Sequence, residues 1–466
     1  MNKTITRLAI MAATAMLATA CETNNINPYD YAGPDSGAGT EQGSADVVNT
    51  ALAQYPKGSI VWTHDTTLTE SVEIAEGASL YIEPGVTVTC KADVQVPVEL
   101  VVLGNLYCMG TAEKPVVFTS DQKKPASWGG IVCGYNSQEV VLAHVDLAYA
   151  GATPTESSPS FQNKLYKTTI DGGLPAFHFC NTNGKLAMVG CFMHDNYNDQ
   201  TYFSGGQGVI YDNIMADNGN AADGGEGINI KAGCKMDVAN NVLYNICTNG
   251  FKLSNQGNSE TVPLSQVVAY NNTLVNCGWR RSKNKKGGSV WIEKAIAPVF
   301  VGNLIYDCRF GMKQPTKNGA DIAHSTIAPN YYFASTETGV EQMGRDAAMA
   351  VWSDLDIKSG APGDKDPLFT AFAQNPKMNI NCEVDDTEKG APLPFDRSWS
   401  FRLKAGSPAL TGAPVDVQQV FPKGLAFIGM KKVIFNNTNE DQDYRFCAPA
   451  PTARFGAELY TDEGIF

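Results

Sequence analysis

Three eight-residue segments, ANNVLYNI (239–246), YNNTLVNC (270–277) and VGNLIYDC (301–308), share one pattern. Two earlier segments, VGCFMHDN (189–196) and YDNIMADN (211–218), align with them, so the pattern recurs every 22 to 31 residues. Its third position is asparagine in all segments but one: Cys191, Asn213, Asn241, Asn272 and Asn303. Its seventh position is always Asp or Asn: Asp195, Asp217, Asn245, Asn276 and Asp307. A repeat of this length is typical of a solenoid, in which each repeat forms one supersecondary unit.

Each repeat consists of short apolar runs separated by Gly, Asn or Asp, a pattern that predicts short strands rather than helices. A short strand cannot bury its apolar face alone, but strands stacked about 4.8 Å apart in successive coils bury a continuous core. Asparagines in one column can hydrogen-bond along the stack and satisfy backbone groups at each turn. We therefore predict an all-β chain that forms a right-handed parallel β-helix, and we interpret both polar columns as structural.

Segments outside the repeats resemble a known family. VEIAEGASLYIEPGVTVTC (72–90), LVVLGNLYCMGTAEKPVVFTSD (100–121) and WGGIVCG (128–134) resemble the first coils of β-helix lipoproteins from Bacteroidetes-type bacteria. DPLFTAF (366–372) and WSFRLKAGSPALTGA (399–413) resemble an ending common in the pectin-lyase-like superfamily. The resemblance covers roughly residues 58–411 and implies the β-helix fold. It does not assign a function, because this fold carries lyases, hydrolases, adhesins and passive binders.

The first 21 residues have the features of a lipoprotein signal peptide. Lys3 and Arg7 precede a short apolar run, and LATAC (17–21) resembles a lipoprotein box in which Cys21 is acylated and becomes the mature N-terminus. Ala18 stands where the box usually has leucine, and the alternative is a secreted protein cleaved at an ordinary site. Residues 22–57 are polar and rich in Gly and Asn, which predicts a flexible tether.

The remaining boundaries follow from composition and from the repeat. The β-helix is expected over residues 58–411, with a long loop at 151–173 and an inserted or capping helix at 337–355. Residues 412–466 are expected to form a C-terminal capping segment over the open end of the coil stack. Such a cap would protect strand edges that could otherwise pair with another chain.

Net charge and cysteine usage narrow the class of protein. The formal net charge is −13, which argues against a general binder of nucleic acid or anionic membranes. The chain has 12 cysteines, and acylation of Cys21 leaves an odd number. Many of them lie within apolar runs, so we predict buried thiols that act as small hydrophobic side chains.

The stretch DGGEGINIKAG (223–233) suggests a calcium site. Gly224, Gly225 and Glu226 resemble a turn of the chondroitinase B and alginate lyase type of β-helix lyases, in which the glutamate binds Ca²⁺. The resemblance implies a metal site at Asp223 and Glu226 and a catalytic base at Lys252, in NGFKLSNQ. The following coil reads GGSVWIEKA and lacks the arginine, histidine and glycine of that family, which puts catalysis in doubt. The alternative is a tight turn with a solvated carboxylate.

A column of polar residues offers a second candidate site. Strand alternation places Lys231, Lys252, Trp291 with Glu293, and Lys313 outward on successive coils. A nearby loop, GWRRSKNKKGG (278–288), adds further cations and an aromatic ring. An exposed tryptophan suits stacking on a sugar ring, and the cations suit carboxylate or sulfate groups. The predicted ligand-binding residues are Trp291, Lys252, Lys313, Lys231, Arg280, Arg281 and Trp279. The alternative is a solvated loop beside a packed tryptophan.

These observations predict a lipid-anchored, surface-exposed outer-membrane protein of the cell envelope that binds a polysaccharide, in particular an acidic one, without cleaving it. Expected partners are the membrane, through Cys21, the glycan, and other outer-membrane proteins such as a glycan importer. No cofactor is expected for binding. The alternatives are a divergent polysaccharide lyase that uses Ca²⁺ and Lys252, and a structural or adhesive surface protein.

Overall fold

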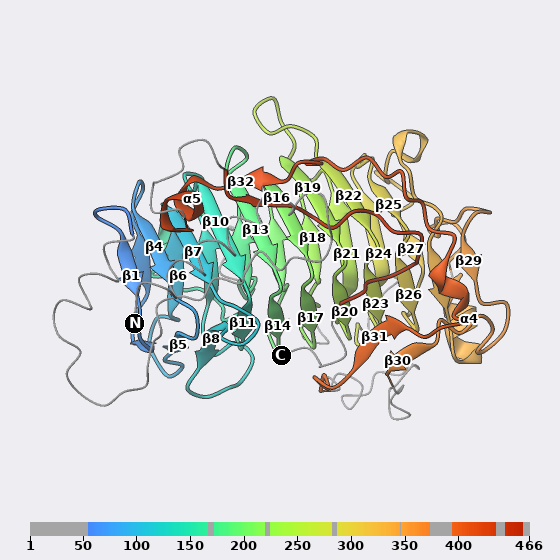
Figure 1. The fold of residues 1–466 in the computed structure, drawn as a ribbon, viewed down its shortest axis with the longest axis horizontal. Helices are drawn as coiled ribbons and strands as arrows, with labels where there is room; N and C mark the ends of the chain where they lie inside the picture. Colours follow the sequence, from blue (N-terminus) through green and yellow to red (C-terminus); the bar gives the residue numbers. More distant parts are fainter. Residues whose placement is uncertain are drawn as a thin grey trace, which may run out of the picture.

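The computed structural model describes residues 55–165, 172–219, 224–281, 287–344, 346–372, 394–434 and 443–459. The chain winds through three long parallel sheets, here called sheets A, B and C (Figure 1). Each of the first nine coils contributes one strand to each sheet, and β28 and β29 extend sheet B alone. Crossovers between parallel strands are almost always right-handed. The chain is therefore the right-handed parallel β-helix that the repeat predicts.

The sheets contain nine, eleven and nine strands. Sheet A contains β1 (Ile60–Trp62), β4 (Ser79–Ile82), β7 (Asn105–Met109), β10 (Glu139–Ala143), β13 (Lys185–Val189), β16 (Gly206–Tyr211), β19 (Cys234–Ala239), β22 (Gln266–Tyr270) and β25 (Val299–Val301). Sheet B contains β2 (Thr66–Leu68), β5 (Thr87–Cys90), β8 (Val116–Ser120), β11 (Val145–Ala148), β14 (Phe192–His194), β17 (Ile214–Ala216), β20 (Val242–Tyr244), β23 (Thr273–Val275), β26 (Leu304–Tyr306), β28 (Tyr331–Phe333) and β29 (Ile357–Lys358). Sheet C contains β3 (Val72–Ile74), β6 (Glu99–Val102), β9 (Gly130–Cys133), β12 (Phe177–Phe179), β15 (Thr201–Phe203), β18 (Ile228–Ile230), β21 (Asn249–Ser254), β24 (Gly288–Glu293) and β27 (Met312–Lys313).

The first polar column forms a hydrogen-bonded ladder at the turn between sheets A and B. The Nδ2 atoms of Asn213, Asn241 and Asn272 each donate to the Oδ1 atom of the next asparagine at 2.9 Å. Asn303 continues the ladder to Asn330 at 3.0 Å, one coil beyond the sequence repeat. The same Oδ1 atoms accept backbone N–H groups of the preceding coil. The ladder therefore satisfies buried backbone donors at each turn, as predicted.

The backbone conformation explains why the second polar column contains only Asp and Asn. All five of its residues have positive φ, between 48° and 57°, a region that Asn and Asp tolerate better than other side chains. The residue before the first column also has positive φ in each repeat: Gly190, Asp212, Asn240, Asn271 and Gly302. The turn chemistry of the repeat thus fixes the corner where the chain leaves one sheet for the next.

Inward-facing side chains of all three sheets form one continuous core. Among the described residues, Cys447 is half-buried. Nine other cysteines there are buried thiols: Cys90, Cys108, Cys133, Cys180, Cys191, Cys234, Cys247, Cys277 and Cys308. The prediction of buried thiols is confirmed for these residues.

The outer face of sheet A is covered by the C-terminal strap, defined as residues 394–434 and 443–459. It contains β31 (Ser400–Leu403), η3 (Pro408–Leu410), β32 (Leu425–Ala426), α5 (Ile428–Ile434) and β33 (Arg445–Phe446). Backbone N–H groups of the strap donate to Asp237 and Glu139, and its apolar residues pack on outward tyrosines and valines of sheet A. The segment is an irregular cap, but it runs along the side of the stack rather than over its open end (Figure 1).

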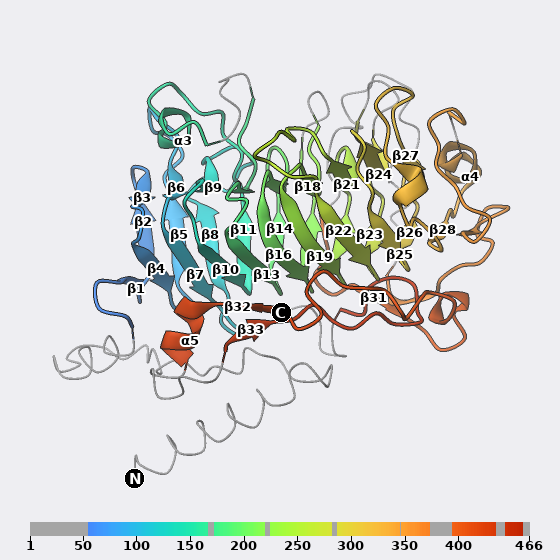
Figure 2. The ribbon, with the colours of Figure 1, turned by 90° about the horizontal axis from the view of Figure 1, so that it is seen from above.

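Other segments cover parts of sheets B and C. Late coils of sheet B pack against the strap and β30 (Phe369–Ala371). Early coils of sheet C are covered by the loop that carries α3 (Pro159–Gln162), where Leu165 and Leu174 pack on Val101 and Val132. Figure 2 shows α3 on the opposite side of the stack from α5 and β33. The outward residues of the middle coils of sheet C are polar instead.

The predicted helix at 337–355 forms only in part. α4 spans Glu337–Met343, with the Thr336 hydroxyl accepting from the Gly339 N–H, and it ends at Gly344. A short 3₁₀ turn, η1 (Ile322–His324), precedes it. None of the helices in the described ranges combines the length and hydrophobicity that a membrane crossing requires.

Gly429, in α5, is expected to be essential for docking the strap. A Cβ atom there would overlap the phenol oxygen and Cζ of Tyr107, whose ring is stacked on Tyr81 at 4.6 Å and cannot retreat. We expect Gly429→Ala to lower the free energy of unfolding by about 2 kcal/mol, measured by urea denaturation. Gly344→Ala is the matched control, because no atom of the described residues lies within 4 Å of its Cβ position. Equal stability of the two variants would contradict this packing.

Candidate functional site

The middle coils of sheet C carry a cluster of outward polar residues. Strand register aligns Tyr202, Asn229, Lys252, Trp291 and Lys313 in one column across five coils. The residues that alternate with them along the strands are all in the core: Ile228, Ile230, Phe251, Leu253, Val290 and Ile292. We define the sheet C cluster as Asp199, Tyr202, Glu226, Asn229, Lys231, Lys252 and Glu293. The predicted order of side chains along this face is thus confirmed.

Lys252 occupies the centre of the cluster. Its Nζ atom lies 3.8 Å from Oε1 of Glu226 and 4.0 Å from Oε1 of Glu293. The side chain of Lys252 is 22% exposed, more than those of Glu226 and Glu293, at 11% and 16%. An ammonium group between two carboxylates is held in place, yet solvent still reaches it. A ligand approaching from solvent can therefore contact Lys252.

The carboxylates of the cluster are fixed by amide donors. Oε2 of Glu226 accepts from the backbone N–H and Nδ2 of Asn249, at 2.9 and 2.8 Å. Asp199 accepts the Glu226 N–H at 2.7 Å and Nδ2 of Asn229 at 2.8 Å. Oδ1 of Asn229 is buried and has no hydrogen-bond partner among the described residues. The cluster thus contains a preformed acceptor that is not used within the described structure.

Burial and charge set different proton affinities for the two lysines. Burial lowers the pKa of Lys252, but the charges of Glu226 and Glu293 outweigh it, and the net pKa is raised. Burial and the nearby Lys252 charge lower the pKa of Lys231 to about 8. Burial raises the pKa of Glu226 more than the Lys252 charge lowers it. Lys252 is therefore a stable cation at neutral pH, and Lys231 is the more easily deprotonated amine.

Lys231 is more enclosed than predicted. It is 4% exposed, lies 5.4 Å from the ring centroid of Tyr202, and Nζ is 3.4 Å from Oε1 of Gln256. Tyr202 is half-buried and Gln256 is exposed. Lys231 thus lies beneath the surface of the cluster, whereas Tyr202 and Gln256 reach solvent.

The predicted exposure of Trp291 and Lys313 is wrong. Trp291 is 5% exposed and its Nε1 donates to Glu293 at 2.9 Å. Lys252 and Lys313 flank it in register, about one strand spacing away on each side, so little of its ring reaches solvent. Lys313 is 3% exposed, pairs with Asp346 at 3.0 Å and lies 3.8 Å from the centroid of the Phe310 ring.

Trp279 and Arg280, in the loop at 278–288, are also less exposed to solvent than predicted. Trp279 is 2% exposed and donates from Nε1 to the Asp307 carbonyl at 2.5 Å. Arg280 is 5% exposed and donates to the backbone carbonyls of Asn218, Gly219 and Asn245. Their exposure as a sugar-stacking ring and a surface cation is therefore wrong, because both hold turns of neighbouring coils together. The other cations of this loop, at 283, 285 and 286, lie outside the described residues.

Arg281 differs from Arg280. Its Nε and Nη1 atoms are buried and have no hydrogen-bond partner among the described residues. Nη1 lies beside Gly224, close enough to obstruct a Cβ atom there, and Gly224 is two residues from Glu226. Unsatisfied guanidinium donors are costly unless an anion or an ordered water meets them. Arg281 is thus a second cationic contact available near the sheet C cluster.

Only one of the two residues of the predicted calcium site lies within the described residues. Asp223 lies outside the described residues. Glu226 is described, and its carboxylate contacts Asn249 and Lys252 rather than further carboxylates. No group of three or more His, Cys, Asp or Glu side chains in the described ranges is arranged to hold a metal ion. Cys21 and the predicted tether up to residue 54 also lie outside the described residues.

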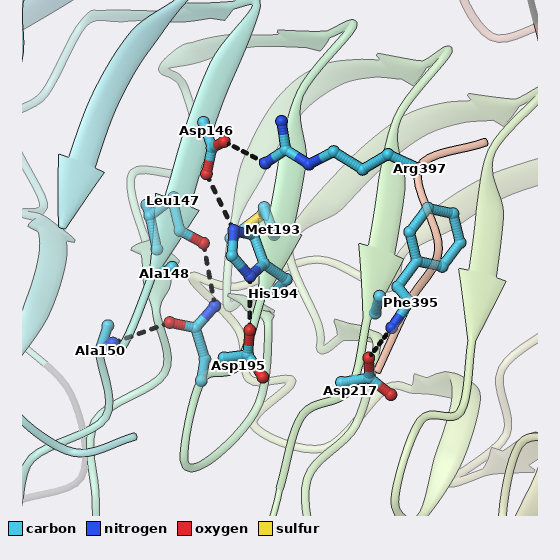
Figure 3. A network of polar contacts seen from close by, with 12 residues as sticks. Asp146, Leu147, Ala148, Ala150, Met193, His194, Asp195, Asp217, Phe395 and Arg397 are labelled. Atoms are coloured by element: carbon cyan, nitrogen blue, oxygen red, sulfur yellow. Dashed lines mark hydrogen bonds and ion pairs between the residues drawn. The ribbon is translucent and has the colours of Figure 1, made fainter. Parts of the chain in front are cut away.

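A second polar network lies on sheet B and was not predicted (Figure 3). His194, at the end of β14, contacts Oδ2 of Asp195 through Nδ1 at 2.6 Å and Oδ1 of Asp146 through Nε2 at 3.0 Å. Arg397 of the strap donates to the other oxygen of Asp146 at 2.6 Å. Burial would lower the pKa of His194, but the two carboxylates raise it to about 9. His194 is therefore an imidazolium at neutral pH.

This network predicts a pH dependence of stability. The pKa of His194 is raised from about 6.5 in the unfolded chain to about 9, so its contribution is complete below pH 6.5 and is lost as pH rises through 9. We expect the free energy of unfolding to fall by on the order of 2 kcal/mol over this window, measured by urea denaturation. His194→Gln should flatten the dependence between pH 6.5 and 9. An identical slope in both proteins would contradict the assignment.

Comparisons with known proteins agree with the fold. Residues 55–162 match the family described as a pectate-lyase-like β-helix domain. The match runs from before β1 to the end of α3, so it covers the early coils and not the sheet C cluster. No curated protein and no solved structure is significantly similar to the chain. The match connects this chain to β-helix domains of a polysaccharide-related type, without identifying a ligand or a reaction.

Proposed function

We propose that the protein binds an acidic polysaccharide at the sheet C cluster and does not cleave it. The observation that carries this proposal is the position of Lys252, an accessible cation between Glu226 and Glu293. Much of the other outer surface is covered: sheet A by the C-terminal strap, late sheet B by β30 and the strap, and early sheet C by the α3 loop. An extended glycan needs a long surface with fixed polar groups, and middle sheet C provides one.

Hydrogen-bonding groups that lack a partner among the described residues favour an acidic sugar. Arg281 has buried donors without a partner in the described chain, and these suit a carboxylate or sulfate. Oδ1 of Asn229 is a buried acceptor without a partner there, and it suits a sugar hydroxyl. Lys252 adds a second cation. A sugar that carries both an anionic group and hydroxyls complements all three.

The proton affinity of Lys252 favours binding over catalysis. A general base must release its proton near the working pH, and the raised pKa of Lys252 opposes that. An ammonium that stays charged is suited to holding an anion. We therefore assign Lys252 the role of a cation that contacts the ligand, instead of the role of a catalytic base.

The proposed setting is the bacterial cell envelope. The signal-peptide pattern and Cys21 support a lipid anchor in the outer membrane, and residues 22–57 a tether that holds the β-helix off the surface. A binder in this position would present its glycan to a neighbouring outer-membrane importer. Globomycin treatment of the expressing bacterium, which blocks lipoprotein processing, should accumulate the precursor. Unchanged processing would favour an ordinary secreted form.

Affinity electrophoresis tests the proposed ligand class. Native gels containing alginate, polygalacturonate or chondroitin sulfate are compared with gels containing neutral dextran or galactomannan. We expect retardation by at least one acidic glycan, weakening as salt rises because exposed charge contacts are screened. Retardation by none of the acidic glycans would overturn the proposal and favour a structural or adhesive role.

One observation favours a second candidate function, a divergent polysaccharide lyase. Lys231 has its pKa lowered to about 8, which suits a general base, and it lies over the Tyr202 ring. A lyase would generate unsaturated sugar ends that absorb ultraviolet light, with or without added Ca²⁺. Growth of that absorbance, abolished by Lys231→Met, would establish the lyase and reject non-catalytic binding.

A further inference from the structure

A small pocket lies on sheet B, a different sheet from the one that carries the sheet C cluster. Its volume is 190 Å³, and it lies where the strap crosses the ends of β14 and β17. Its walls are Phe192, His194, Asp195, Asp217, Pro394, Phe395 and Arg397. His194, Asp195, Asp217, Phe395 and Arg397 are labelled in Figure 3, together with Asp146. Strand and strap therefore form this pocket together.

The charges of the side chains that form the pocket walls nearly cancel. His194 is shared by Asp146 and Asp195, and Arg397 pairs with Asp146, so two cations balance two carboxylates. Asp217 accepts the Phe395 N–H and Nδ2 of Asn245, both at 2.8 Å. Burial raises the pKa of Asp217 to about 7, so its charge is only partial at neutral pH. A strongly charged ligand would have no matching net charge here.

Two polar side chains of the pocket, those of Asp195 and Arg397, reach solvent. Oδ2 of Asp195 contacts His194, whereas Oδ1 has no partner in the described chain, and the side chain is 38% exposed. The side chain of Arg397 is 47% exposed, and its guanidinium lies 4.6 Å from the centroid of the Phe192 ring. The ring of Phe395 packs against that of Phe192, with their centroids 5.6 Å apart. The pocket thus offers an acceptor, donors and an apolar wall within one small volume.

We propose that this pocket binds a single ring of a neutral sugar, as a carbohydrate site separate from the sheet C cluster. Adjacent hydroxyls of a pyranose would donate to Oδ1 of Asp195 and accept from Arg397. The C–H face of the ring would pack on Phe395 and Pro394. Carboxylates at Asp146, Asp195 and Asp217 disfavour an anionic sugar, and the imidazolium and guanidinium disfavour a cationic one.

The chain offers a conservative variant for testing this site. Asp195 has φ 51°, and the equivalent turn positions Asn245 and Asn276 have φ 51° and 57°. Asp195→Asn therefore preserves the turn while removing the charge that strengthens the hydrogen bond to a sugar hydroxyl. Asp416→Asn makes the same charge change at an exposed position outside the pocket.

Saturation-transfer NMR on the full chain provides the measurement. Methyl glucoside, methyl galactoside and methyl mannoside are compared with glucuronate and glucosamine. We expect transfer to at least one neutral glycoside, about tenfold weaker binding in Asp195→Asn, and no change in Asp416→Asn. Thermal unfolding of both variants checks that the fold is retained.

Three results would overturn the proposal. These are no transfer to any neutral glycoside, stronger binding of glucuronate or glucosamine than of every neutral sugar, or equal binding by Asp195→Asn and wild type. The outcome is independent of the proposed function, because gel retardation by acidic glycans reports on sheet C and not on this pocket.

Discussion

Lys252→Met is expected to weaken binding of an acidic glycan by roughly tenfold to a hundredfold, measured by isothermal titration with the glycan that retards the protein most. The substitution removes the accessible cation and leaves Glu226 and Glu293 without their shared partner. Two uncompensated carboxylates would then face an anionic ligand. The effect therefore combines a lost attraction with a new repulsion.

Two further variants separate this effect from damage to the fold. Lys235→Met removes the same charge from an exposed position on β19 and should leave binding unchanged. Glu293→Gln removes a negative charge beside Lys252 and should leave binding unchanged or make it tighter. If Lys252→Met and Glu293→Gln weakened binding to the same extent, the explanation by charge would be wrong.

Asn272→Leu is expected to lower the free energy of unfolding by about 4 kcal/mol, measured by urea denaturation. Asn272 is fully buried, and its Oδ1 accepts both the backbone N–H and Nδ2 of Asn241. Its own Nδ2 donates to Oδ1 of Asn303 and to the Val238 carbonyl. Leucine fills a similar volume but leaves those buried groups without partners, and each orphaned group is costly.

Asn183→Leu provides the matched control for the ladder. Asn183 is exposed on a turn, so the same substitution there should change stability by less than about 0.5 kcal/mol. A loss below about 1 kcal/mol in Asn272→Leu would contradict a structural role for the ladder.

The repeat predicted the fold because its signal is local and periodic. Asn213, Asn241, Asn272 and Asn303 carry enough information to fix the register of successive coils, and the ladder follows from that register. Asn330 extends the ladder, but its segment, PNYYFAS, has Ala334 where the second polar column should continue, so it did not align. Inward and outward directions on sheet C were likewise predictable from strand alternation.

The solvent exposure of side chains was less predictable than the direction in which they point. Lys313 points outward as predicted, but Asp346, 33 residues later, closes over it. Trp279 and Arg280 looked like surface groups because their loop is strongly cationic, yet both turn inward to carbonyls of neighbouring coils. Strand alternation identifies which way a side chain points, whereas exposure depends on segments that no local pattern identifies.

The sheet B network could not be predicted from any short motif. Arg397 reaches Asp146 across 251 residues of sequence. His194 and Asp195 belonged to the repeat, but the repeat alone explained them as strand and turn residues. Only the path of the C-terminal strap along the side of the stack brings these groups into one pocket, and that path differs from the end cap that the sequence suggested.

Hydrogen–deuterium exchange with a saturating acidic glycan locates the bound ligand on the protein. Binding at the sheet C cluster predicts slower exchange in peptides covering residues 224–231, 252–258 and 287–293, and no change in strands β19 and β22 of sheet A. Slower exchange confined to the C-terminal strap or to sheet A, with those sheet C peptides unchanged, would contradict it.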